Sequence, residues 1–383
     1  MKQISSLDLY FLTHEFKQKL ENSRIETFYY EKGIFYIRLY TKKDANMYLT
    51  NKVSKYIYMT KEKDEMSEPK NFVQYLRKYL KNAYIKTITQ VENERIIKLE
   101  LEYKDPETKE VKIYYLILEL FANGNVILVD KDMTILNSLE KKKFKDRTVM
   151  VKDTYELPPA KELNLFNPKL DLLEKELKET DLSIVKFLAI KFGIGGKFAE
   201  EICELTQIDK NINANELKKE QIKQITEKLS KIINTPLHAY NVLDENDKII
   251  DFIPFDFISI KNKKVENISF NEAIKNYYES EQEETEDQKE KEYGKELAKL
   301  INRLKKQESQ KDEILIDYEK LNGIGNKIYD NFSLLEELLN QINTASKEKG
   351  WEHVQKTIKE NPKLKKLIKT LNYKNNEIIL ELE

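Results

Sequence analysis

The sequence contains little cysteine, glycine, proline and tryptophan. Its 383 residues include 1 Cys, 9 Gly, 8 Pro and 1 Trp. The single thiol, Cys203, excludes a disulfide framework and a cysteine-based zinc site. The three histidines, His14, His238 and His353, lie too far apart for a metal-ligand spacing. We therefore expect no metal or other cofactor.

Long apolar runs are also absent from the sequence. No run approaches the roughly 18 residues that a membrane-spanning helix requires. Met1-Lys2-Gln3 is not followed by the apolar core of a signal peptide. We expect a cytoplasmic protein with no membrane partner.

The sequence has neither a strong charge of one sign nor a familiar catalytic signature. Lys and Arg number 66, Asp and Glu number 67, and the formal net charge is −1. A nucleic-acid site must therefore be a local patch. There is no Walker loop, no G-x-S-x-G elbow, no H-E-x-x-H motif and no Cys–His pair. We expect a binding protein and not an enzyme.

The first part of the chain alternates between helical and strand-like periodicity. Apolar spacing predicts helices over 7–22 and 71–82, and a β-hairpin over 24–40 that turns at Lys32-Gly33. Further strands are expected at 46–50, 55–59, 84–91, 96–103, 111–121 and 124–130, with a loop at 61–70. The fold class is therefore α+β.

The rest of the chain predicts four more segments. The expected divisions are 1–168 for the first domain, 169–235 for a helical module, 236–280 for an extended segment packing back on the first domain, 281–335 for a coiled-coil arm, and 336–383 for a small cap. Strands are expected at 240–243, 248–255 and 257–261, with a short helix at 270–278. In the arm, a narrow apolar stripe interrupted at 307–311 predicts pairing with one other helix, possible through a second copy of the chain. Trp351 is expected to anchor the cap, which ends in a strand at 377–380.

A glycine-rich junction in the helical module is the most informative local motif. Residues 192–202 read FGIGGKFAEEI, so one helix ends at glycines and another begins at once. Free backbone N–H groups at a helix N-terminus bind phosphate, which makes Gly193, Gly195, Gly196 and Lys197 candidate phosphate ligands. The alternative is that the glycines only permit a tight turn between helices.

This junction resembles the helix–two-turn–helix of formamidopyrimidine-type DNA glycosylases and the related helix–hairpin–helix. Those enzymes use an N-terminal catalytic amine, usually on a proline followed by glutamate, and many carry a four-cysteine zinc finger. Met1-Lys2-Gln3 and the single cysteine supply neither. The junction therefore predicts nucleic-acid contact without glycosylase chemistry.

Several motifs together resemble the NFACT family, the NEMF/RqcH ribosome quality-control factors whose bacterial members were first called fibronectin-binding proteins. The matching segments are ISSLD at 4–8, FVQYLRKYL at 72–80, QVENERII at 90–97, LILELFANGNVIL at 116–128 and the junction at 193–210. The resemblance implies an NFACT-N domain related to the N-terminal fold of formamidopyrimidine glycosylases, then a helix–hairpin–helix module and a coiled-coil arm. It also implies an NFACT-R domain, which would follow where the sequence ends at Glu383.

Members of that family bind the large ribosomal subunit obstructed by peptidyl-tRNA and recruit tRNA for template-free C-terminal tailing. The added residue is alanine in bacterial and archaeal members, which makes alanyl-tRNA a candidate partner. The resemblance implies that peptide bonds are formed by the ribosome and that this protein has no catalytic residues.

The resemblance assigns tRNA binding to Asp8, Glu94, Arg95 and Glu119. Glu94 stands where the family has aspartate. Each residue has an alternative role: Asp8 as a helix N-cap, Arg95 as a surface partner of Glu94, and Glu119 as an edge-strand carboxylate.

Two basic patches are candidate contacts to the RNA backbone. Arg77 and Lys78 lie on the second helix with Lys81, and the other patch is Lys141-Lys142-Lys143-x-Lys145-x-Arg147. Ordinary solvated faces are the alternative for both. As functions, a glycosylase-like nucleic-acid-binding protein and a protein-binding adhesin or scaffold stay open, although the lack of an export signal counts against the adhesin.

Overall fold

The protein divides into two compact units, Met1–Glu286 and Asp287–Glu383. The computed structural model describes residues 2–42, 46–62, 71–144, 147–158, 163–166, 168–373, 375 and 377–382, with the backbone alone over 283–292. Most of the predicted loop at 61–70, and Lys145 of the second basic patch, lie outside the described residues.

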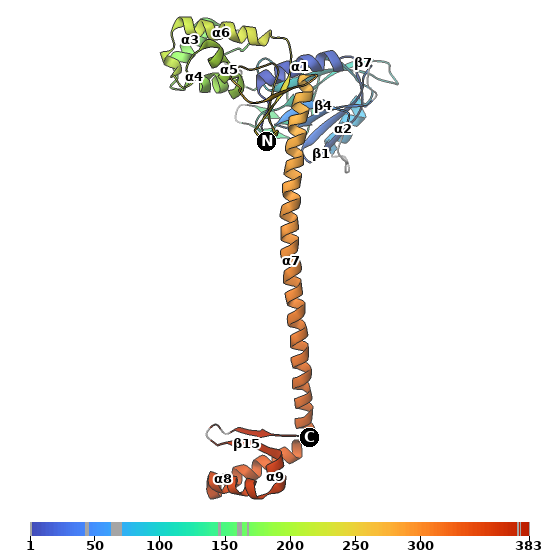
Figure 1. Cartoon of the computed structure of the whole chain (residues 1–383). Coiled ribbons are helices and arrows are strands. Elements are labelled where there is room, and N and C mark those ends of the chain that lie inside the picture. Colours follow the sequence, from blue (N-terminus) through green and yellow to red (C-terminus); the bar gives the residue numbers. More distant parts are fainter. Residues whose placement is uncertain are drawn as a thin grey trace. The chain divides into compact units, whose positions relative to one another are not determined.

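The first unit is built on a nine-stranded sheet (Figure 1). Its strands are β1 (Arg24–Glu31), β2 (Ile34–Tyr40), β3 (Met47–Lys52), β4 (Tyr56–Thr60), β5 (Tyr84–Gln90), β6 (Ile96–Lys104), β7 (Val111–Glu119), β8 (Asn125–Asp130) and β9 (Ile135–Ser138). They lie in the order β4-β3-β2-β1-β5-β6-β7-β8-β9, and every neighbouring pair is antiparallel. The predicted α+β class is confirmed.

The β1–β2 hairpin shows how local chemistry sets the register of this sheet. Lys32 and Gly33 have φ of 47° and 79°. Two successive left-handed residues make a type I′ turn, whose twist matches that of the flanking strands. The turn places Glu31 opposite Ile34, as the sequence predicts.

Two helices pack on the sheet. Helix α1 (Ser6–Leu20) contacts β5, and α2 (Asn71–Leu80) contacts β1. Their apolar side chains join one continuous core with the strands because the helical period gathers them on one face. A two-stranded hairpin, β10 (Lys142–Lys143) and β11 (Thr148–Val149), follows the large sheet.

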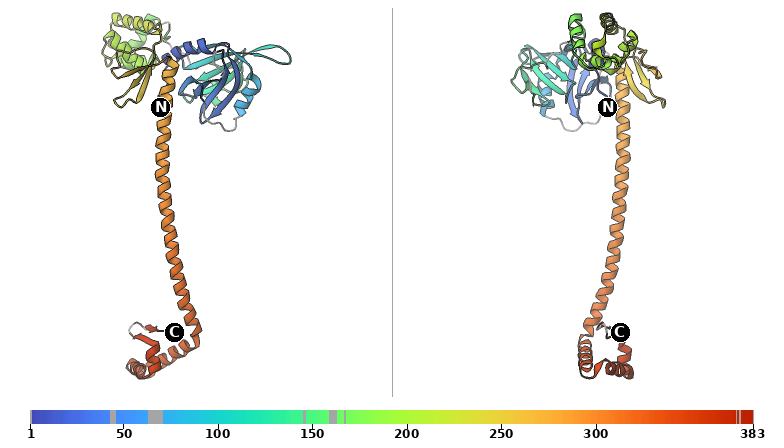
Figure 2. Two further views of the ribbon diagram at one scale, coloured as in Figure 1. Left: turned by 45° about the vertical axis from the view of Figure 1, so that its right-hand side comes forward. Right: turned by 90° about the vertical axis from the view of Figure 1, so that its left-hand side faces the viewer.

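A helical module comes next in the first unit, drawn in green and yellow in Figure 2. Its helices are α3 (Leu170–Lys178), α4 (Ile184–Lys186), a π-helical turn at Phe187–Lys191, α5 (Gly196–Thr206), a 3₁₀ turn at Ala214–Glu216 and α6 (Lys219–Ile233). The break at the glycine-rich junction falls where the sequence predicts it.

The extended segment forms a small three-stranded sheet. Its strands are β12 (Tyr240–Leu243), β13 (Ile249–Ile253) and β14 (Lys264–Glu266), in the order β13-β12-β14. The strand predicted at 257–261 is wrong. The amides of Ile258 and Ser259 donate to the buried carboxylate of Glu201, at 3.1 and 2.9 Å, and so are not available to a strand ladder.

Helix α7 (Phe270–Asp330) begins in the first unit. The predicted short helix at 270–278 is its first part, so the predicted helix end at 278 is wrong. No proline interrupts 270–330, and the charged stretch after 278 is rich in the helix formers Glu, Gln and Lys. The apolar residues of the predicted stripe are exposed: Leu297, Leu300, Ile301, Leu304, Ile314, Leu315, Tyr318 and Leu321.

The second unit ends in a small cap. Helix α8 (Phe332–Glu360) is bent at Gly350, where φ is 77°, and is followed by α9 (Pro362–Leu367) and the hairpin β15 (Ile368–Asn372) and β16 (Glu377–Leu380). The bend lets Leu338 pack with Val354 from the other half of α8. Trp351 packs against this cluster, as predicted.

The start of α7 generates a stability prediction. The buried carboxylate of Glu15 accepts the amides of Phe270 and Asn271, at 2.7 and 3.0 Å, and so caps α7 from α1. Glu15→Ala leaves two buried donors without partners, and we expect it to lower the free energy of unfolding by about 1–3 kcal/mol. Urea unfolding followed by circular dichroism measures this. Gln18→Ala, at an exposed position on the same helix, is the control, and equal unfolding midpoints for both variants would refute the cap.

Candidate nucleic-acid interface

A buried ion pair joins α1 to α5. The Nζ atom of Lys197 lies 2.7 Å from Asp8 Oδ1, and the two side chains are 7% and 2% exposed. The same ammonium donates to the Phe252 carbonyl at 2.7 Å and lies 4.0 Å from the centre of the Phe252 ring. Asp251 Oδ1 is 3.7 Å away. Charge and hydrogen bonds thus compensate for the burial of Lys197.

This geometry corrects two expectations. Lys197 was predicted as a phosphate ligand, but its ammonium is enclosed by protein groups and does not face solvent. Asp8 is not the N-cap of α1. That residue is Ser5, whose hydroxyl oxygen accepts the Asp8 amide at 3.1 Å, while Asp8 Oδ2 accepts the Ser5 amide at 2.9 Å. Asp8 is therefore the third residue of a capping box.

Asp251 extends the network to the N-terminal segment through an ion pair with Lys2. Burial would raise the pKa of its carboxyl, but the charges of Lys197 and Lys2 outweigh that effect and hold the pKa below its usual value. The sequence contained one signal that was missed: Asp251 interrupts the apolar run of β13.

The glycine-rich junction lies against the start of α1. Gly193 and Gly195 have φ of 82° and 86°. A Cβ at Gly195 would lie 2.7 Å from the Ser5 Cβ, whereas one at Gly196 would meet nothing within 4 Å. The requirement for glycine at 195 thus comes from backbone conformation and close packing. Phosphate binding by Gly193, Gly195 and Gly196 stays a prediction. No side chain caps the N-terminus of α5, the helix that begins at Gly196.

Glu94 and Arg95 lie in the turn between β5 and β6, next to the first turn of α1. Gln90 Nε2 donates to the carbonyls of Ser6 and Glu94, at 2.9 Å each, and fixes the turn to the helix. Arg95 is half-buried, and its Nη1 donates to Gln3 Oε1 at 2.7 Å. Burial lowers the pKa of the Arg95 guanidinium, and the charge of Glu94 acts against that change.

Tyr278, on the first part of α7, contacts the N-terminal segment. Its hydroxyl donates to the Lys2 carbonyl at 2.9 Å. Burial first, and then the charge of Asp8, raise its pKa. Asp8 itself is sealed from solvent by its ion pair with Lys197, so of the predicted cluster only the Glu94–Arg95 turn can meet a ligand.

Glu119 lies apart from this cluster. It is 2% exposed on β7, which is an inner strand, so the edge-strand alternative is wrong. Its Oε1 accepts Arg147 Nη1 at 2.7 Å and the Tyr155 hydroxyl at 2.9 Å. Burial would lower the Arg147 pKa, but the hydrogen bond and charge of Glu119 raise it overall. Neither Glu119 nor Arg147 presents its charge to a ligand, which corrects both assignments.

The remaining cations divide into structural and exposed groups. Arg77 donates through Nε and Nη2 to the Phe28 carbonyl, at 2.9 and 2.7 Å, and lies over the Tyr29 ring. Arg77 thus holds α2 on β1. It was predicted to bind phosphate, and this prediction is corrected because its guanidinium is already engaged. Lys78, Lys141 and Lys143 are exposed.

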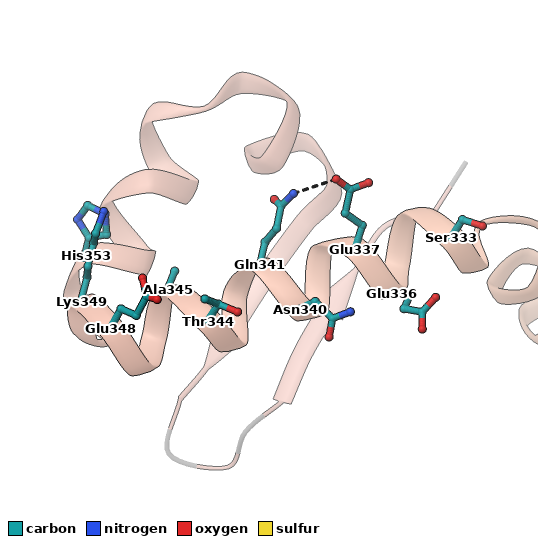
Figure 3. Close-up of a pocket in the computed structure, with 10 residues that line it drawn as sticks. All are labelled: Ser333, Glu336, Glu337, Asn340, Gln341, Thr344, Ala345, Glu348, Lys349 and His353. Carbon is teal, nitrogen blue, oxygen red and sulfur yellow. Dashed lines mark hydrogen bonds between the residues drawn. The ribbon is translucent and has the colours of Figure 1, made fainter.

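The cap has a depression of its own on one helix. An open depression of about 620 Å³ lies along α8, where Gln341 donates to Glu337 at 3.1 Å (Figure 3). Its lining combines the carboxylates of Glu336, Glu337 and Glu348 with the side chains of Lys349 and His353, and it is not part of the candidate interface.

Within the described part of the chain, no group of three or more His, Cys, Asp or Glu side chains is placed to hold a metal ion. Cys203 is buried, and burial raises the pKa of its thiol to about 11. Among the helices of the described residues, none combines the length and apolarity needed to cross a membrane.

The fold and site define a multidomain α+β protein with a buried charge network and exposed surface lysines. The family model for NFACT N-terminal and middle domains matches residues 5–376, and the chain belongs to this family.

Its relatives include ribosome quality-control proteins. The archaeal Rqc2 homolog aRqcH of Methanocaldococcus jannaschii is 32% identical over 91% of this chain and 53% of its own length. The Rqc2 homolog RqcH of Streptococcus pneumoniae is 29% identical over 51% of this chain and 38% of its own. Ribosome quality control complex subunit 2 of Saccharomyces cerevisiae is 34% identical over 36% of this chain and 13% of its own. The chain thus spans about half the length of the archaeal relative.

Two solved structures share the fold. The N-terminal part of the fibronectin/fibrinogen-binding protein of Streptococcus suis matches with a TM-score of 0.58 at 22% identity, over 72% of this chain and 99% of that one. The fibrinogen-binding protein of Staphylococcus aureus matches with a TM-score of 0.57 at 19% identity, over 72% and 98%.

The contribution of Asp251 to stability can be tested through its dependence on pH. Because the folded pKa of Asp251 lies below its usual value near 3.8, its contribution to stability is complete above that value and is lost as the pH falls through the lower folded pKa. We expect Asp251→Asn to lower the free energy of unfolding by about 1–2 kcal/mol at pH 6, a deficit that shrinks below about pH 4. Asp247→Asn, at an exposed ion pair, is the control. A deficit independent of pH would contradict the network.

The two adjacent glycines give a matched pair of variants. We expect Gly195→Ala to lower the free energy of unfolding by about 2 kcal/mol or more, because of its positive φ and the contact with Ser5. Gly196→Ala should be neutral or slightly stabilising, since its Cβ meets open space in the first turn of α5. Thermal and chemical denaturation of both variants measure the difference. Equal effects would rule out the packing account of Gly195.

Proposed function

We propose that this chain is the tRNA- and large-subunit-binding part of a ribosome quality-control factor. It recruits tRNA, alanyl-tRNA being the candidate, for template-independent tailing of nascent chains on an obstructed large ribosomal subunit. Membership of the NFACT family and the names of the relatives support this role. In this proposal the chain positions substrates and the ribosome makes the peptide bonds.

The observation that carries the proposal is the placement of Arg95. Its turn is fixed to α1 by Gln90, which limits the motion that binding would have to suppress. Its guanidinium is only half-buried, and its hydrogen-bond partner Gln3 is an exposed side chain that a phosphate or a base edge can displace. A guanidinium can bind either group through two parallel hydrogen bonds.

Glu94 adds selectivity in this proposal. It is the neighbour of Arg95 in the same turn, and it is half-buried. A carboxylate beside the guanidinium repels phosphate but accepts hydrogen bonds from base amino groups. The pair therefore suits a base edge better than the phosphate backbone. The Glu94 side chain is one methylene longer than the family's aspartate.

The exposed lysines supply the sequence-independent part of binding. We propose that Lys78, Lys141 and Lys143 contact RNA phosphates, because each is exposed. Arg77, Arg147 and Lys197 act on the protein's own structure and do not contribute to this electrostatic term. Binding should therefore weaken with salt in proportion to a small number of phosphate contacts.

Arg95→Ala tests this proposal. We expect tRNA affinity to fall about tenfold, and the slope of log affinity against log salt to decrease in size by about one if the contact is to a phosphate. Filter binding at four salt concentrations measures both quantities. Arg24→Ala, which removes a partly exposed arginine from β1 of the same sheet, should bind as the unaltered protein does. Equal dissociation constants for Arg95→Ala and the unaltered protein would overturn the assignment of Arg95.

A further inference from the structure

A groove of about 290 Å³ lies between α1 and the end of β5. One wall is formed by Tyr10, His14 and Lys17, which recur every three or four residues and so share a face of α1. Phe166 and Glu92 also line the groove. The mechanism proposed above uses none of these side chains.

The groove contains a preformed aromatic surface. The Tyr10 and Phe166 rings are 4.7 Å apart with 34° between their planes, and the His14 ring is 4.4 Å from Tyr10. Tyr10 and Phe166 are partly buried and pack against the main core, and the Phe166 amide is held by Asn164 at 2.9 Å. The rings are therefore fixed in place, which lowers the entropic cost of stacking a planar ligand on them.

Polar groups at the rim suit a nucleotide. His14 Nδ1 lies 2.9 Å from the Tyr10 carbonyl, so Nδ1 donates and, in the neutral ring, Nε2 is an acceptor. Lys17 and Glu92 are exposed, and no ion pair between described residues engages either. Together they offer a cation for a phosphate, and acceptors for the amino or imino groups of a base.

The groove adjoins the candidate tRNA site. Glu92 and Arg95 belong to the same turn, and Gln90, which also lines the groove, holds that turn to α1. A nucleotide at Arg95 and a nucleotide in the groove would therefore contact the same turn.

We propose that this groove takes one unpaired nucleobase of the bound tRNA. The base stacks on Tyr10 and Phe166, its hydrogen-bond donors meet Glu92 or His14, and its phosphate meets Lys17. The inference rests on the proposed function, because it names the part of the tRNA that the site holds. A free nucleotide has the same base and phosphate groups as a nucleotide of tRNA, so the experiment must distinguish these two ligands.

The test uses the full chain and tRNA in which 2-aminopurine replaces one unpaired base at a time. We expect one position to change its fluorescence on binding. Phe166→Leu and Tyr10→Leu should abolish that change and weaken tRNA binding about tenfold, the usual effect of losing one stacked base. Tyr84→Leu is the matched control, since Tyr84 is an exposed ring on β5 that does not line the groove. His14→Ala is a second variant that leaves the core intact because His14 is exposed.

A second readout separates failure of the groove from failure of the proposed function. The chain has three histidines, so the His14 ring signals in nuclear magnetic resonance are identified by their loss in His14→Ala. Shifts of these signals by tRNA, or by AMP, GMP, CMP or UMP, support the groove. If the chain binds the mononucleotides but not tRNA, the groove is a free-nucleotide site and the proposed function fails. If tRNA binds while no 2-aminopurine position responds and the leucine variants bind as the unaltered protein does, the groove inference is overturned and the proposed function stands.

Discussion

The buried ion pair between Asp8 and Lys197 is the contact through which three parts of the first unit are joined. Asp8 belongs to the capping box of α1, Lys197 to the first turn of α5, and the ammonium also bonds to the Phe252 carbonyl of β13. Burying a charge without its partners is energetically unfavourable. The Asp8–Lys197 pair is therefore stable only in the arrangement in which all three elements meet. The position of the Arg95 turn follows, because that turn is fixed to the same end of α1.

Buried carboxylates play one recurring role in this unit. Asp8, Glu15 and Glu201 each accept backbone amides: those of Ser5, of Phe270 and Asn271, and of Ile258 and Ser259. Each satisfies donors that a helix end or loop would otherwise leave unpaired. Because Glu15 and Glu201 act on segments distant in sequence, they fix the extended segment and the start of α7 to earlier helices. These three acidic side chains thus serve the architecture of the first unit.

The prediction of the fold from sequence succeeded where neighbouring residues decide the outcome. The β1–β2 hairpin follows from Lys32-Gly33, and α2 follows from the spacing of Phe72, Val73 and Leu76. It failed at 257–261 because a carboxylate from α5 takes the amides that a strand would use. The predicted helix end at 278 is too early because the charged residues that follow have high helix propensity and continue α7.

For the candidate site, the sequence by itself determined which residue types are present, and the family motifs predicted a cluster of Asp8, Glu94 and Arg95. Only the tertiary structure decided that Asp8 and Glu119 are sealed in ion pairs while Arg95 keeps a solvent-facing side. The physical reason is that a charge's availability depends on its burial and on its partners. Those partners, Lys197 for Asp8 and Arg147 for Glu119, lie 189 and 28 positions away along the chain and carry no local signal.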